Sequence, residues 1–514
     1  MIEATGRTPV RVGVWMLVAT LALPAGARSQ TPPVPTSLSL EEAVQIALNN
    51  NPSHLSSRND ADVADWDVRA AYGSWAPSLS ANSSFSWQGP GEQRFGSLTT
   101  EELGFGNQPS YYFSTYSLGM SYTVDGATLL APGQARARRE ATDARIRSSA
   151  ATLEQTVTAA YLEVLRQEEG LRLARRQLAR AEANARLATA QRDVGSVTQL
   201  DVSRADVEVG RARVEVLRAE NAVTTARVAL HRQLGSNPDS QDRRVELTTE
   251  FELLEPAWTA EGLFGEALRH NPLLAELEAS RVAADYQVRT ARSAYFPSLS
   301  LEAGISGFAR EASDLSSVIG QAQAQAEAEI QQCQALNEVF SRLADPLPPQ
   351  DCSQLALGQE RIDAIRESND AFPFDFTRQP TQATLAISIP IFQGLGRQRD
   401  LEAAQVERQD ALYRVRDQEL ALRADIASGL AAVETAYQSA MIEAENQQVA
   451  DEQLRLAREQ YAVGQISFID LAEAETVKAQ ADRERIAALY AYHDALANLE
   501  AIVGRSLRDA ANEE

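Results

Sequence analysis

The sequence is poor in the residues that most often build reactive or metal-binding sites. Its 514 residues include two cysteines and four histidines, and none of them lies at the spacing of metal ligands. No serine nucleophile elbow, phosphate-binding loop or HExxH motif is present. We therefore expect no metal, no cofactor and no catalytic residues, and the chain is not expected to be an enzyme. The histidines are expected to be surface or capping residues; they are His54, His231, His270 and His493.

Positive charge is also scarce. The 48 Lys and Arg residues are outnumbered by 71 Asp and Glu residues, which gives a formal net charge of −23 at pH 7. Because binding to a phosphate backbone requires a basic surface, nucleic acid is not an expected partner. The acidity suits solubility or a pathway that attracts cations.

Long hydrophobic runs are almost absent. One apolar run extends from Val12 to Leu23, which is shorter than the ~20 residues that a membrane-spanning helix needs. Arg7 and Arg11 precede it and Ala25-Gly26-Ala27 follows it, which is the arrangement of a secretory signal peptide. We expect residues 1–29 to be that signal rather than an anchor helix. Because no other apolar stretch is long enough to span, any insertion into a membrane must use β-strands.

The two cysteines, Cys333 and Cys352, are close together in the sequence. In an exported protein such a pair is more often a disulfide than two free thiols. A disulfide within one loop is therefore expected.

What the chain does contain is the same module twice. Asn51-Pro52 recurs 220 positions later as Asn271-Pro272, whereas Gly195 recurs 269 positions later as Gly464. The two constant offsets indicate a tandem duplication with about 49 extra residues in the second copy. The expected ranges are 30–254 for the first repeat, 255–514 for the second repeat and 309–380 for an extended outer loop within the second.

Two periodicities run through each copy. Apolar and polar side chains alternate strictly over residues 116–124 and 383–391, as in a β-strand with one apolar face. A half-buried soluble sheet has this pattern, and so does a lipid-facing sheet with aromatic girdles. Long tracts with apolar residues every three or four positions predict helices with coiled-coil seams. The expected strands are about 78–88, 112–125, 298–308 and 381–392; the expected helices are about 38–75, 134–193, 199–234, 258–295, 399–462 and 468–503.

Four strands are too few for a closed barrel, which needs about eight. In lipid, an open sheet edge would leave backbone groups unpaired at a cost of several kcal/mol each. If these strands enter a membrane, several protomers must therefore share one barrel.

Short glycine turns are expected between the long helices. Gly195 and Gly464 are predicted to end one helix, and Asp201 and Asp470 to lie at or near the start of the next. A carboxylate at that position caps backbone N–H groups and meets the favourable end of the helix dipole. Capping alone would explain both aspartates.

Four motifs occur in order along the chain, at residues 38–52 (LSLEEAVQIALNNNP), 76–79 (APSL), 296–300 (FPSLS) and 461–471 (YAVGQISFIDL). In this order and spacing, the chain resembles the TolC-like outer-membrane efflux proteins from about Leu38 to Gly504. The resemblance implies a mainly α fold with a transmembrane β portion. It implies a homotrimer whose protomers share a 12-stranded β-barrel, continued by a periplasmic 12-helix coiled-coil α-barrel.

The resemblance also implies a function and a location. The chain would be a passive, porin-like exit duct in the outer membrane of a Gram-negative bacterium, with a large periplasmic portion. It would contact outer-membrane lipid, dock on a periplasmic adaptor (membrane fusion) protein, and receive substrate from an inner-membrane RND or ABC-type pump. The tip turns at Gly195 and Gly464 are implied as adaptor contacts.

Carried over position by position, the resemblance places a pore constriction at the helix tips. TolC is the archetype of this family. Its first-tip aspartate falls on Asp201, and its second-tip tyrosine falls on Tyr461. Its two pore-ring aspartates fall on Asp470 and Glu473, whereas its arginine falls on Ile466, so that ion pair is missing. We expect Asp470 and Glu473, three residues apart on one helix face, to form carboxylate rings that narrow the pore and select for cations.

A soluble periplasmic coiled-coil adaptor without a pore is the competing hypothesis. The alternating strands favour the duct, because an adaptor needs no lipid-facing band. For the extra segment 309–380, a cap over the barrel mouth and an exposed ligand site both remain open. The sequence does not indicate which substrate is exported or which pump family is the partner.

Overall fold

The computed structural model describes residues 37–91, 94–99, 109–237, 245–343 and 348–508. The signal peptide expected at residues 1–29 therefore lies outside the described residues. The chain forms two compact units, each of which draws on both copies of the repeat. The first unit comprises the described residues up to Leu55 with Leu153–Glu255 and Thr435–Ala497; the second comprises Ser56–Thr152, Pro256–Glu434 and the residues from Asn498 on.

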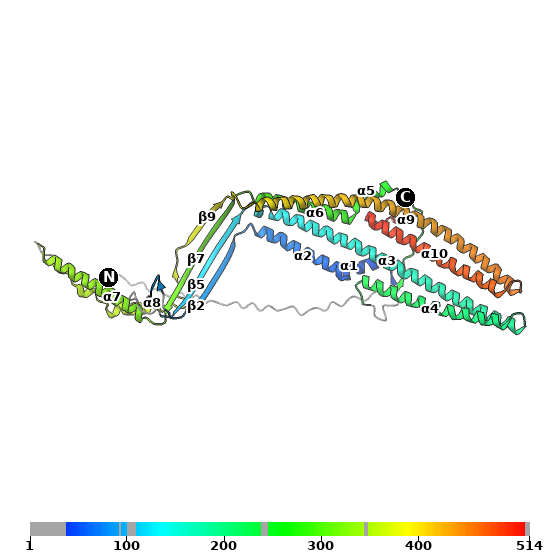
Figure 1. The fold of residues 1–514 in the computed structure, drawn as a ribbon, viewed down its shortest axis with the longest axis horizontal. Coiled ribbons are helices and arrows are strands. Elements are labelled where there is room, and N and C mark those ends of the chain that lie inside the picture. The colour runs from blue at the N-terminus through cyan, green and yellow to red at the C-terminus, as the bar shows by residue number, and fades with distance from the viewer. Residues whose placement is uncertain (1–36, 92–93, 100–108, 238–244, 344–347, 509–514) are drawn as a thin grey trace, which may run out of the picture. The chain divides into compact units, whose positions relative to one another are not determined.

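The second unit contains an antiparallel sheet. Its long strands are β2 (Ser78–Gln88), β5 (Tyr111–Val124), β7 (Ser298–Ala312) and β9 (Gln382–Ser388), side by side in that order (Figure 1). A short strand β8 (Thr377–Arg378) also pairs with β7. β5 of the first copy thus pairs with β7 of the second, with Leu118 opposite Ile305. Within the described ranges, β2 and β9 have one neighbour each and leave one edge unpaired.

The strand register gathers apolar side chains on one face of this sheet. Leu79 lies opposite Met120 on β5, and Leu301 lies opposite Leu385 on β9. Because paired residues point to the same side, all four are on one face, which we call the apolar face. The other face carries small polar side chains that bond across the strands, such as Ser78 to Ser121 at 2.7 Å and Ser84 to Thr115 at 2.7 Å.

The last strand is shorter than predicted. A strand was expected over residues 381–392, but β9 ends at Ser388. Pro390 follows two residues later and has no N–H to donate to a neighbouring strand. The residues after the strand, Ile391 and Phe392, are exposed.

The extra segment, expected as an extended outer loop over residues 309–380, is mainly helical. β7 continues to Ala312, and then follow α7 (Ser316–Ser341), the 3₁₀ helix η2 (Cys352–Leu355) and α8 (Gln359–Asn369). The Ala, Gln and Glu residues of α7 all favour helix. A disulfide joins Cys333 of α7 to Cys352 of η2, and the Asn369 side chain bonds both backbone groups of Ala312 at 2.9 Å.

Each expected N-terminal helix of a repeat is two helices. Those of the first copy are α1 (Leu40–Asn50) and α2 (Pro52–Gly73); those of the second are α5 (Ala260–His270) and α6 (Pro272–Ser293). The break falls at Asn51 and Asn271, whose backbones are extended because each precedes a proline. Both side chains also bond to the C-terminal end of another helix. Asn51 donates to Gln233 O at 2.9 Å, and Asn271 donates to Ile502 O at 2.8 Å.

The long helices are α3 (Gly126–Asp193), α4 (Gln199–Gln233), α9 (Gly396–Ala462) and α10 (Phe468–Val503). α3 starts well before residue 134, where the sequence predicts its beginning, and passes through Pro132. Proline leaves the carbonyl four residues earlier without a helical donor. That carbonyl, of Thr128, instead accepts the indole N–H of Trp75 at 2.9 Å, so the helix persists through the proline.

The main core of the first unit lies where α1, α3 and α4 meet the short strands β1 (Ser37–Leu38) and β6 (Glu246–Leu247). Tyr161 is fully buried there; its hydroxyl donates to Leu38 O at 2.8 Å and accepts from Thr249 N at 3.1 Å. A further short hairpin, β3 (Arg94–Phe95) and β4 (Leu98–Thr99), follows β2 in the sequence. None of the helices in the described ranges is both long and apolar enough to span a bilayer.

Candidate functional site

The candidate site is the pair of helix tips in the first unit, where α3 turns into α4 and α9 turns into α10. Gly195 has φ 77° and Gly464 has φ 76°, the left-handed conformation that a side chain disfavours. The amide after each glycine bonds back to a carbonyl near the helix end, Ser196 N to Gln191 O at 2.9 Å and Gln465 N to Gln460 O at 2.8 Å. Both turns are therefore Schellman caps with the same geometry.

The next helix starts in the same way at both tips. The Asp201 carboxylate accepts from the backbone N–H and hydroxyl of Thr198, at 3.0 and 2.7 Å, and Asp470 accepts from Ser467 at 2.9 and 2.8 Å. These are capping boxes, which satisfy backbone donors at the helix start. The hydrogen bonds from Thr198 and Ser467 lower the pKa of Asp201 and of Asp470 below the ordinary value of an aspartate.

Tyr461 lies inside an apolar cluster that joins the two tips. Tyr461 is 3% exposed, and its ring meets that of Phe468 edge-on at a centroid distance of 6.2 Å. Burial and the nearby Asp201 carboxylate both raise the pKa of Tyr461, so the structure brings these two residues of different tips together. Its hydroxyl is buried and has no hydrogen-bond partner among the described residues. The tip cluster consists of Ala188, Val202, Ala205, Leu454, Tyr461, Phe468, Leu471 and Ala474.

Glu473 differs from the other candidates. It is exposed, one turn beyond Asp470, and it makes no hydrogen bond or ion pair within the part of the chain that the structure describes. Ile466, which stands where the archetype has an arginine, packs against the tip cluster. Asp201 and Asp470 thus cap the starts of helices, whereas Glu473 has no such contact among the described residues. Their roles in a pore remain predictions, because they depend on an assembly.

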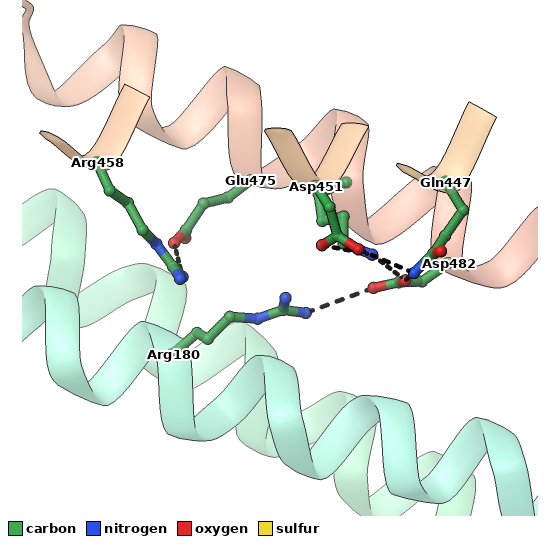
Figure 2. A network of polar contacts seen from close by, with 7 residues as sticks. Arg180, Gln447, Asp451, Arg458, Glu475 and Asp482 are labelled. Carbon is green, nitrogen blue, oxygen red and sulfur yellow. Dashed lines mark hydrogen bonds and ion pairs between the residues drawn. The ribbon is translucent and has the colours of Figure 1, made fainter. Parts of the chain in front are cut away.

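A buried ion cluster lies above the tips and was not predicted from the sequence. Lys478 of α10 has a 4% exposed side chain and pairs with Asp482 of the same helix and with Asp451 of α9, the latter at 3.0 Å. Gln447 donates to Asp482 at 3.0 Å, and Arg180 of α3 lies 3.7 Å from it. Figure 2 shows Arg180 reaching from α3 toward Asp482, so the cluster connects three helices.

Two opposing effects act on the pKa of Asp482 in this cluster. Burial alone would raise its pKa, but the hydrogen bonds from Lys478 and Gln447 and the charges of Lys478 and Arg180 outweigh burial and lower it. Nearer the tips, Glu475 of α10 accepts from Arg458 of α9 at 3.0 Å and from Asn184 of α3 at 2.7 Å. The α9–α10 hairpin is therefore tied to α3 at two levels, by the hydrogen bond from Asn184 to Glu475 and by the ion pair of Arg180 with Asp482. Figure 2 shows the second of these contacts.

One sequence signal could have revealed this cluster. Lys478 is the single lysine of the chain. It lies in a buried row of α10 that is otherwise apolar or aromatic: Phe468, Leu471, Ala474, Lys478 and Ala481. A lone lysine in the apolar seam of a helix requires a buried counter-charge. Which carboxylate supplies it depends on the packing of α9 and α10.

A groove of about 520 Å³ runs beside the tips, between α3 and α9. Arg180 and Asn184 line one side of it and Arg458 the other, with Tyr461 and Leu471 also among its lining residues. Charged and apolar groups thus meet in an accessible hollow next to the tip cluster.

Comparisons with known proteins agree with this arrangement of sheet and paired helices. A family model described as outer membrane efflux protein matches residues 43–236 and 263–505. The pyoverdine export outer membrane protein OpmQ of Pseudomonas aeruginosa is 33% identical over 163 residues, which make up 32% of this chain and 34% of OpmQ. The match thus spans about a third of the length of that relative.

Two solved structures have a similar fold at low sequence identity. The CmeC outer membrane channel of Campylobacter jejuni is matched with a TM-score of 0.66 at 15% identity, over 92% of this chain and 88% of that chain. The MtrE outer membrane channel of Neisseria gonorrhoeae, in its open state, is matched with a TM-score of 0.63 at 20% identity, over 91% of this chain and 89% of that chain.

Proposed function

The chain belongs to the outer membrane efflux protein family, and on that premise we propose that it is the outer-membrane exit duct of a tripartite efflux or secretion system. The observation that carries this proposal is the sheet. Its apolar face is exposed, with Leu79, Leu385 and Ile387 all largely accessible. A soluble protein rarely leaves so continuous an apolar surface open to water. An exposed apolar sheet face of this kind is typical of the lipid-facing surface of a transmembrane β-barrel.

The open edges of the sheet support a trimer. β2 and β9 each have one partner strand in the described chain, and unpaired strand edges are excluded from lipid. Pairing β9 of one protomer with β2 of the next satisfies both edges. Three copies of the four long strands make a 12-stranded barrel, and the paired helices of three copies make the 12-helix periplasmic barrel. The protein performs no chemistry in this role, because substrate moves by the work of a pump.

The helix tips are the proposed control point of the duct. Asp470 and Glu473 of three protomers would face the axis as carboxylate rings, with Asp201 and Tyr461 behind them. Charge at close quarters selects among ions, so these rings would favour cations. The adaptor protein would contact the tip turns at Gly195 and Gly464, and an RND or ABC-type pump would deliver substrate through it.

Single-channel recording of the purified protein in planar bilayers tests the proposal. We expect trimers that conduct, that prefer cations, and that migrate differently on gels before and after heating. The double variant Asp470→Asn, Glu473→Gln should lose most of the cation preference. Asp206→Asn, which removes an exposed carboxylate of α4, is the matched control and should not change it.

The outcomes separate the parts of the proposal. A soluble, monomeric product without conductance would refute the duct and favour the adaptor. A conducting trimer whose selectivity is the same in the double variant and in the control would refute only the carboxylate rings.

A further inference from the structure

The extra segment ends in a short aromatic stretch that crosses the sheet. Residues 371–376, which we call the aromatic strap, follow α8 and lead into β8. Every second residue of the strap is a phenylalanine that meets an aromatic ring of β2 or β5. Phe372 lies 5.4 Å from Tyr112 and 6.3 Å from Phe85, and Phe376 lies 4.8 Å from Tyr116, all between ring centroids.

The register shows which face of the sheet the strap covers. Tyr112, Ser114 and Tyr116 alternate in step with Leu118 and Met120 of β5, so they lie on the apolar face. Ser114 is completely buried under the strap, and its hydroxyl donates to Pro373 O at 2.6 Å. The strap therefore lies on the apolar face, at the end of the strands nearest the extra segment.

The close packing at one glycine of β7 indicates that the strap makes a specific contact with the sheet. Gly307 of β7 lies opposite Tyr116. A Cβ added to Gly307 would be 2.4 Å from the Tyr116 ring and 3.1 Å from Thr377 O. The ring thus occupies the space that a side chain would need, which brings Tyr116 against Phe376 and the end of the strap.

The outer surface of the strap remains aromatic and carries charges of both signs, because Asp375 of the strap and Arg378 of β8 are exposed. Phe374 is 69% exposed, beside Phe85 at a centroid distance of 6.4 Å, and Trp87 of the same face is also exposed. Arg378 of β8 lies opposite Gly307 and is exposed, so it points to this face as well. Aromatic rings with a nearby arginine suit the boundary between hydrocarbon and phosphate headgroups.

We propose that the aromatic strap sits in the phosphate-bearing headgroup region of the outer leaflet and anchors the extra segment to the membrane outside the barrel. This inference rests on the proposed function, which places the apolar face in lipid. The strap is bonded to the apolar face, which in that function is the outside of the barrel. The exposed aromatic surface of the strap continues the apolar surface of the strands, and Arg378 supplies the charge that a phosphate would bind.

Site-directed spin labelling of the full chain, reconstituted into phospholipid vesicles, tests the strap. Phe374→Cys can be labelled selectively, because Cys333 and Cys352 are joined in a disulfide. Leu385→Cys on the apolar face is the lipid reference, and Glu360→Cys on the exposed side of α8 is the water reference. The measured quantity is the ratio of collision rates with oxygen, which dissolves in lipid, and with a water-soluble nickel chelate.

We expect the Phe374 label to give a ratio several-fold above that of Glu360 and below that of Leu385, as at a headgroup boundary. A ratio equal to that of Glu360, with Leu385 in lipid, overturns the strap but leaves the duct intact. If the Leu385 label is itself in water, the proposed function fails.

A second variant keeps the test decisive should the labelled cysteine variant not assemble. Phe374→Trp adds an indole at the same position, and bromine atoms placed near the lipid carbonyls should quench the additional fluorescence. Emission that is unchanged by brominated lipid overturns the strap.

Discussion

Replacing Lys478 by methionine removes the cation from the centre of the ion cluster and keeps an unbranched side chain of similar length. The lysine side chain is 4% exposed and lies against Asp482, which is 11% exposed, and Asp451, which is 55% exposed. The substitution leaves Asp482 buried without its main partner. We expect α10 to separate from α9 more readily around residue 478, because the ion pair of Lys478 with Asp451 is lost there.

The magnitude follows from how exposed each carboxylate is. The pair with Asp451 is largely in water and contributes at most about 1 kcal/mol. Removing one partner of a fully buried pair costs about 3–5 kcal/mol. Asp482 keeps Arg180 at 3.7 Å and a hydrogen bond from Gln447, which offset part of that penalty. We therefore expect the free energy of local opening to fall by about 2–3 kcal/mol.

Hydrogen exchange of the backbone amides over residues 471–484 measures this opening. A change of that size should speed exchange there by about 30- to 150-fold. Arg455→Met is the matched control, because Arg455 makes two ion pairs within α9 that are exposed, and it should leave exchange in α10 unchanged. Adding Asp482→Asn to Lys478→Met should restore most of the protection. The reasoning is refuted if Lys478→Met behaves like Arg455→Met, or if the double variant exchanges as fast as the single one.

Three further predictions concern single side chains and can be checked by thermal unfolding. Gly235→Ala would place a Cβ 2.3 Å from Asn50 O at a backbone φ of 69°, so the free energy of unfolding should fall by more than about 3 kcal/mol. Gly210→Ala, in open space within α4, is its control and should raise the free energy of unfolding by about 0.5–1 kcal/mol. Equal effects of the two substitutions would contradict both expectations. Tyr461→Phe removes a buried hydroxyl without a partner in the described chain and should stabilise by up to about 1 kcal/mol; a loss would mean that the hydroxyl gains a partner in the trimer. Ser467→Ala should return the pKa of Asp470 upward toward its ordinary value, because the hydrogen bonds from Ser467 lower it. A carboxyl group whose pKa is lower in the folded than in the unfolded state stabilises the fold above the unfolded pKa, and this contribution is lost as the pH falls through the folded pKa. The loss of stability in Ser467→Ala should thus be full at pH 7 and should shrink in acid. A loss of stability that is independent of pH would contradict this cause.

Features that depend on a few neighbouring residues could be read from the sequence. β2 and α10 begin and end at the residues predicted for them, 78–88 and 468–503. Gly195 and Gly464 adopt the left-handed turns that their positions suggested. Such features are fixed by local backbone preference and by the spacing of apolar side chains, and both are visible in one stretch of chain.

Boundaries were missed where a distant residue changes the local outcome. Pro132 is expected to stop a helix, yet α3 passes through it because Trp75 takes over the stranded carbonyl. The position of the extra segment between two strands predicts a loop, whereas its Ala and Gln residues favour the helices α7 and α8 that the structure contains. In the first case a tertiary contact decides where the helix begins; in the second the local composition decides that helices form.

The sequence by itself determined the tandem repeat, the alternating strands, the long helices and the capped tips, because each depends on residues close together in the chain. Only the tertiary structure decided that β5 of one copy pairs with β7 of the other, and that the aromatic strap lies on the apolar face. Only it showed that the lone Lys478 meets Asp451 and Asp482 beside Arg180. The reason is physical: strand register and the partner of a buried charge are set by packing between segments far apart in the sequence, and no local preference specifies which segments those will be.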